Sequence, residues 1–110
     1  MTDLMNEKNT LTAQLNASVR ELRNSGTAYA QAEKDYKVLL RTECLKLRDE
    51  GMAVGMIDKV CFGIPSVAEA RFKRDVAEAV YKANQEAINS IKLQIRIIAE
   101  QINREWTNEV

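Results

Sequence analysis

Apolar residues recur every three or four positions through the first half of the chain. Between residues 2 and 50 the sequence has no proline and one glycine, and residues with high helix propensity dominate. The recurring apolar positions are Leu4, Leu11, Leu15, Val19, Leu22, Tyr29, Ala32, Tyr36, Leu39 or Leu40, and Leu47. This spacing predicts a long amphipathic helix over about residues 3–50. At the serine-glycine pair 25–26 the helix either continues or is interrupted, because glycine weakens a helix by about 1 kcal/mol relative to alanine.

The second half of the chain carries a stricter version of the same pattern. Its core positions alternate by four and three residues, which is the seven-residue repeat of a helix that packs along another helix. The repeat comprises Ala77, Tyr81, Asn84, Ile88, Ile91, Ile95, Ile98 and Ile102. Ser66 and Glu69 form an S-x-x-E capping box, so we expect the helix to begin near Val67 and to cover about residues 67–107. At Asn84 a buried amide would fix the register or the oligomeric state.

Residues 51–65 separate the two predicted helices and hold three of the four glycines and the only proline. Gly51 stands where a glycine that ends a helix is expected. The segment 52–64 is apolar, and its spacing favours a short helix over about residues 54–62. This segment either caps the end of the molecule and buries its apolar side chains, or presents them to a partner as an exposed tip.

Two long helices of similar length, joined by this link, predict an all-α fold. We expect a long antiparallel helical hairpin with a short helical apolar link, in a single domain over residues 1–110. The second helix also carries small or apolar residues beside its repeat: Val76, Val80, Ala83, Ala87 and Ile97. Since two helices alone make a thin core, we expect this face to be covered. The cover would be either a second copy of the chain, giving a four-helix homodimer, or residues 52–64.

Charge and cysteine content narrow the class of protein. The 110 residues carry 16 basic and 16 acidic side chains, which disfavours proteins that wrap nucleic acid or lie on anionic membranes. The sequence shows no signal-peptide pattern and no apolar run of membrane-spanning length, so we expect a cytoplasmic protein. Cys44 and Cys61 are expected to be buried free thiols rather than a disulfide bond. Trp106 is expected either to close the open end of the hairpin near Leu4 or to form part of a contact surface.

Residue types that usually carry catalysis are scarce. The chain has no histidine, which removes the commonest general base and metal ligand, and the spacing of its two cysteines matches no zinc site. Glycine-based motifs for phosphate binding or for a nucleophile are also missing from the sequence. We therefore expect a non-enzymatic protein with no catalytic residues, no metal and no cofactor.

Four stretches between about residues 28 and 106 carry a resemblance to a known group of proteins. They read "YAQAEKDYKVLL", "LRDEGMAVGMIDKV", "ARFKRDVAEAVYKANQEAINSIKLQIRII" and "INREW". In these stretches the chain is similar to small, uncharacterised helical accessory proteins of phages and prophages of Gram-positive bacteria, a group without an assigned activity. The resemblance implies a short accessory product made in the host cytoplasm, and it carries over no functional residues. Residues 1–27 depart from the pattern of the group.

These observations lead to three functional hypotheses. The first is a phage-encoded factor that binds a host protein and inhibits or redirects it, with a defence nuclease of the CRISPR type as the target class considered first. Its expected contact residues are Met52, Met56, Phe62, Arg71, Lys73 and Arg74. The second is an accessory of phage replication or recombination that binds single-stranded nucleic acid. Its expected contact residues are Lys34, Lys37, Arg41 and Arg48, on one side of the first helix. The third is a structural coiled coil in virion assembly.

Overall fold

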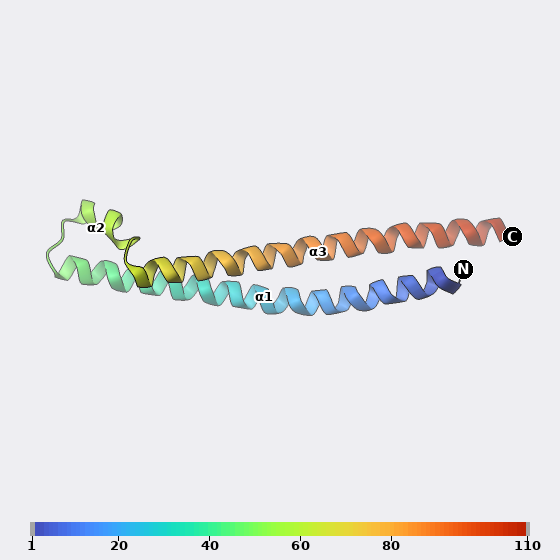
Figure 1. Cartoon of the computed structure of the whole chain (residues 1–110), viewed down its shortest axis with the longest axis horizontal. Coiled ribbons are helices and arrows are strands. Elements are labelled where there is room, and N and C mark those ends of the chain that lie inside the picture. Colours follow the sequence, from blue (N-terminus) through green and yellow to red (C-terminus); the bar gives the residue numbers. More distant parts are fainter. Residues whose placement is uncertain (1, 110) are drawn as a thin grey trace. The chain divides into compact units, whose positions relative to one another are not determined.

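Three helices account for nearly all of residues 2–109, which are the residues that the computed structural model describes. They are α1 (Thr2–Asp49), α2 (Val54–Cys61) and α3 (Pro65–Glu109) (Figure 1). No strand occurs within this range. The predicted fold class, an all-α helical hairpin with a short helical link, is confirmed. The contacts divide into two compact units, one over residues 25–81 and one made of residues 2–24 with 82–109.

Helix α1 continues through Ser25 and Gly26 without a break. Ser25 is buried, and Gly26 lies against the ring of Tyr81 on α3. A Cβ atom at position 26 would stand 3.5 Å from Cε2 of Tyr81, which is an ordinary van der Waals contact. Tertiary packing at this point therefore outweighs the weak helix propensity of glycine.

The end of α1 follows the expected glycine cap. Gly51 has a φ of 90°, in the left-handed region that glycine adopts without steric cost. Its N–H donates to the carbonyl of Arg48 at 3.0 Å, and the N–H of Met52 donates to the carbonyl of Leu47 at 3.1 Å. These two bonds define a Schellman motif, which satisfies the last carbonyls of the helix and turns the chain toward α2.

The start of α3 differs from the prediction. The helix begins at Pro65, and the first backbone bond runs from the N–H of Ala68 to the carbonyl of Ile64 at 2.9 Å. Ser66 consequently lies inside the first turn and is not the N-cap residue. Proline is favoured at the first helical position because its φ is already helical and its missing N–H would have no helical partner.

The unit over residues 25–81 has a small core where the three helices meet. Tyr36 of α1, Cys61 of α2 and Val67 of α3 are its buried members, and the last two have no exposed surface. Partly buried residues surround them: Leu39, Leu40, Cys44, Leu47, Ile64 and Ala70. Further along the same unit the rings of Tyr29 and Tyr81 lie 6.1 Å apart. Each of the three helices thus contributes at least one side chain to this core.

The other unit pairs the first part of α1 with the last part of α3. Leu11, Ile88 and Ile98 are buried, as the periodicity predicted. Asn84 is half-buried, and its Nδ2 donates to the backbone carbonyl of Glu21 at 3.4 Å, so the amide at this repeat position is satisfied across the helix pair. Trp106 is 62% exposed, so the expectation that it closes the end of the hairpin is wrong. It follows the half-buried Glu105 by one residue, which turns its side chain about 100° away from the buried side.

Every residue predicted to lie on the two helix seams is buried or half-buried. The additional face of α3 is not covered within the chain, since Val76 and Val80 are 46% and 48% exposed. The link over residues 52–64 therefore does not cover those two residues. The alternative cover, a second copy of the chain, stays a prediction.

Candidate partner-binding site

A groove of about 410 Å³ lies between α1 and α2. Its lining residues are Lys37, Leu40, Arg41, Cys44, Leu45 and Arg48 of α1, with Val54, Ile57 and Asp58 of α2. We call this set the tip groove. It exists because the chain turns after Gly51 and α2 lies back beside the end of α1 (Figure 1).

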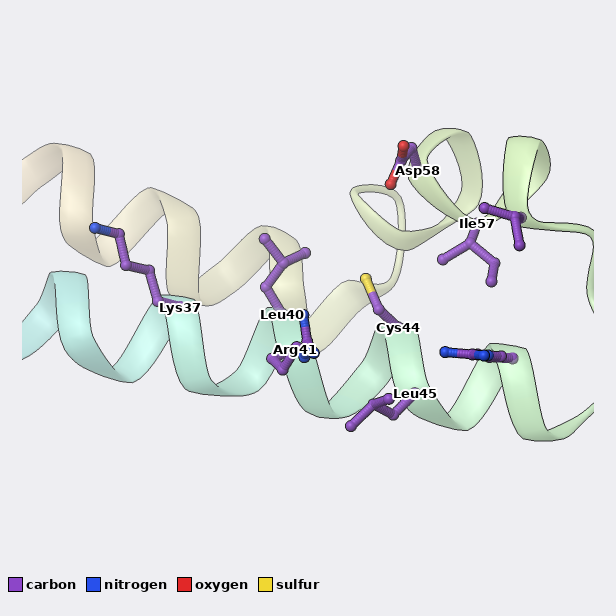
Figure 2. Close-up of a pocket in the computed structure, with 9 residues that line it drawn as sticks. Lys37, Leu40, Arg41, Cys44, Leu45, Ile57 and Asp58 are labelled. Atoms are coloured by element: carbon purple, nitrogen blue, oxygen red, sulfur yellow. The ribbon is translucent and has the colours of Figure 1, made fainter.

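The apolar part of the tip groove is built from both helices. Ile57 points from α2 toward α1, and the sulfur of Cys44 points from α1 toward α2 (Figure 2). Ile57 is buried, whereas Leu45 and Val54 are exposed, so apolar surface remains open to solvent at the groove. An open apolar groove of this kind is typical of a contact site.

The charged part of the tip groove is mainly basic. Three basic side chains line it against a single acidic one, Asp58. Lys37 also forms an ion pair with Glu33 at 3.4 Å, one turn earlier on α1. Arg41 and Arg48 form no hydrogen bond or ion pair with any residue that the structure describes. Their guanidinium groups are available to an acidic ligand from outside the chain.

The contact residues expected for the host-protein-binding hypothesis lie around the link and in the first part of α3. The guanidinium carbon of Arg71 lies 5.6 Å from the ring centroid of Phe62, and the two side chains form a cation–π pair on the surface. Phe62 is exposed, and Met56 is exposed on α2, whereas Met52 is half-buried. The link therefore combines both predicted alternatives: Ile57 and Cys61 are buried as a cap, while Val54, Met56 and Phe62 stay exposed.

Arg74 contacts α1, whereas Arg71 contacts Phe62. Its guanidinium lies 4.5 Å from the ring centroid of Tyr36 on α1, and its Nε and Nη2 donate to Oδ1 of Asp75 at 3.1 and 2.9 Å. The hydrogen bond to Asp75 raises the pKa of Arg74, so the group stays charged. Arg74 thus contacts α1, and its charge is already engaged inside the chain.

Two of the predicted contact residues, Lys73 and Lys34, lie outside the tip groove and apart from the link. Lys73 lines a separate hollow between α1 and α3 together with acidic Asp35 and Glu69. Lys34 is exposed on α1 and does not line the tip groove. The structure thus brings Lys37, Arg41 and Arg48 together at the groove and leaves Lys34 outside it.

The two cysteines meet beside the groove. Both are free thiols, and Sγ of Cys44 donates to Sγ of Cys61 at 3.1 Å. Sγ of Cys61 in turn lies 3.7 Å from the carbonyl oxygen of Leu40. Burial raises the pKa of the Cys61 thiol to about 11, with smaller contributions from Cys44 and the carboxylates of Glu43 and Asp58.

In the part of the chain that the structure describes, no three metal-ligating side chains come together. None of the helices in residues 2–109 joins sufficient length with sufficient apolar character to cross a bilayer. Comparison of the chain with protein-family models, curated proteins and solved structures gives no match.

The α2 side of the tip groove could not be predicted from sequence. Lys37, Arg41 and Arg48 recur at helical spacing and could be assigned to one side of α1. Ile57 and Asp58 become their neighbours only because α2 lies back along α1. The signal for that reversal was Gly51, but a capping glycine does not fix the direction of the chain that follows it.

Proposed function

We propose that this chain is a phage-encoded, non-enzymatic protein-binding factor that inhibits or redirects a host protein, a defence nuclease being the target class to test first. The observation that supports it most is the tip groove, where exposed Leu45 and Val54 adjoin the unpaired Arg41 and Arg48. Apolar contact with a rim of arginine is the composition that protein interfaces favour. The partner surface we propose is acidic with an apolar side chain at its centre.

The test is capture of partners from host lysate by the tagged full chain, with nuclease treatment before capture. We expect one protein in stoichiometric amount that survives the treatment. The double substitution Arg41→Glu with Arg48→Glu should abolish its capture, because it reverses the charge of the groove. Lys34→Glu is the control on the same helix outside the groove, where it reverses one charge against the two reversed in the groove variant.

A second variant tests the predicted contact residues around the link. Phe62→Ser removes the exposed ring that Arg71 contacts and leaves the buried core intact. We expect weaker capture with an unchanged circular dichroism spectrum. Full capture by both the groove variant and Phe62→Ser would place the interface elsewhere on the chain and contradict the proposal.

Binding of single-stranded nucleic acid is the second candidate, because three of its four expected residues do gather at the tip groove. Two observations disfavour it. No aromatic ring on which a base could stack is among the lining residues, and the chain has no net positive charge. Binding of a labelled oligonucleotide that falls steeply with salt, together with loss of every captured protein after nuclease treatment, would favour it over the protein-binding factor.

A further inference from the structure

The two thiols are closer than their roles as core side chains require. Their sulfur atoms are 3.1 Å apart, and a disulfide bond needs about 2.05 Å, so an approach of about 1 Å would join them. Cys44 belongs to α1 and Cys61 to α2. A bond between them would connect the two helices that form the tip groove.

The two sulfurs differ in their access to solvent. Cys44 is half-buried and lines the groove, and its sulfur is visible there between α1 and α2 (Figure 2). Cys61 has no exposed surface, and its sulfur contacts the sulfur of Cys44. A reagent that enters the groove therefore meets Cys44 first, and Cys61 is already in place beside it.

We propose that Cys44 and Cys61 form a reversible disulfide bond that ties α2 to α1, made by exchange with a low-molecular-weight disulfide such as oxidised glutathione. This inference does not depend on the proposed function. A half-buried cysteine in contact with a second, resolving cysteine is the arrangement of thiol pairs that respond to redox state.

The exchange proceeds in two balanced steps. The Cys44 thiol gives up its proton, and its thiolate attacks one sulfur of oxidised glutathione. A Cys44–glutathione bond forms, the glutathione S–S bond breaks, and one glutathione leaves and takes up the proton. The Cys61 thiol then gives up its proton and attacks the Cys44 sulfur, which releases the second glutathione in its thiol form. The two electrons lost by the cysteines reduce one molecule of oxidised glutathione to two thiols.

The pKa of Cys61 favours this order of events. Burial keeps the Cys61 thiol protonated at neutral pH, so it is a poor first nucleophile. It needs to react only after the mixed disulfide has formed on Cys44. The two sulfurs are 3.1 Å apart, so the effective concentration of the Cys61 thiol at that disulfide is very high. The bond would hold Ile57 and Asp58 against α1 and fix the width of the tip groove.

The test uses the reduced full chain, incubated with oxidised glutathione at low protein concentration, denatured in an alkylating reagent and weighed intact. We expect the mass of the native chain to fall by about 2 Da, with neither cysteine alkylated. The melting temperature should rise by about 5–15 °C, because the bond closes a short loop of the unfolded chain.

Single substitutions distinguish Cys44, the first thiol to react, from Cys61, the thiol that resolves the mixed disulfide. Cys61→Ser should stop at a glutathione adduct on Cys44. Cys44→Ser should form no glutathione adduct, because Cys61 is inaccessible in the folded chain, and its Cys61 should be alkylated after denaturation. Both variants should keep the circular dichroism spectrum of the parent chain. A parent chain that is fully alkylated, that stops at a glutathione adduct, or that forms only a disulfide between two chains on a non-reducing gel would overturn the proposal.

Discussion

Gly26 and Gly51 show how one residue type serves two purposes in this chain. Gly51 has a positive φ that other residues adopt only with strain, and it ends α1. Gly26 lies inside α1 with no positive φ, and an additional Cβ there would reach Tyr81 only at 3.5 Å. The first glycine is required by backbone conformation, and the second is not.

Substitution of each glycine by alanine should therefore have opposite effects. Gly26→Ala should raise the free energy of unfolding by about 0.5–1 kcal/mol, because alanine is the better helix former. Gly51→Ala should lower it by about 1–3 kcal/mol through backbone strain. Urea denaturation followed by circular dichroism measures both. A destabilised Gly26→Ala would show that the Tyr81 contact has no room for a methyl group.

Cys61 gives the stability of the chain a pH dependence. Its pKa in the folded chain is about 11, against an ordinary value of 9.0, so the folded state resists ionisation. The protonated thiol contributes about 2–3 kcal/mol to the free energy of unfolding. This contribution is fully present below about pH 9 and is lost as the pH rises through about 11. The ionisable groups that neighbour Cys61 are Cys44, Glu43 and Asp58, and each of them also raises its pKa.

The comparison with Cys61→Ala isolates this effect from the titration of tyrosine and lysine. Under reducing conditions the parent chain should be the more stable at about pH 8, and its advantage should shrink by about pH 11. Urea denaturation at a series of pH values gives the two curves. Parallel curves would mean that Cys61 ionises as easily in the folded chain as in the unfolded one.

At the scale of elements, sequence periodicity predicted most of the fold. Positions spaced by three and four residues predicted which sides of α1 and α3 are buried, because that spacing reflects the geometry of the helix itself. The prediction that Ser66 is the N-cap was wrong because two helix-start signals compete there, the capping box and the proline. The helix begins with the proline at its first position. The position of α2 was not predictable, since it depends on which of its few apolar side chains reach the core.

Ile57 should be the residue that holds α2 in place together with Cys61. It is 7% exposed, whereas the neighbouring Met56 is 49% exposed. Ile57→Ala should lower the free energy of unfolding by about 2–4 kcal/mol and speed amide hydrogen exchange in residues 54–61. Met56→Ala is the matched control and should change stability by less than about 0.5 kcal/mol. Equal effects of the two substitutions would contradict the observed orientation of α2.

For the whole molecule, the uncovered face of α3 predicts self-association. Val76 and Val80 lie one turn apart and remain about half exposed, so a second copy of the chain would remove apolar surface from water. The parent chain should sediment as a dimer. Val76→Glu with Val80→Glu should sediment as a monomer with unchanged helicity, and Val38→Glu, on an exposed position of α1, should remain a dimer. A monomeric parent chain would exclude this role for the face.

The satisfied pairing of Asn84 with Glu21 has a consequence for the order in which the chain folds. These residues are 63 positions apart, whereas Cys44 and Cys61 are 17 apart. Closing the longer loop first would cost about 1 kcal/mol more in chain entropy. We expect the transition state to contain the core around Cys61 and Val67, with pairing of the termini later. Substitutions in that core should slow refolding, whereas substitutions at Leu11 or Ile98 should mainly speed unfolding.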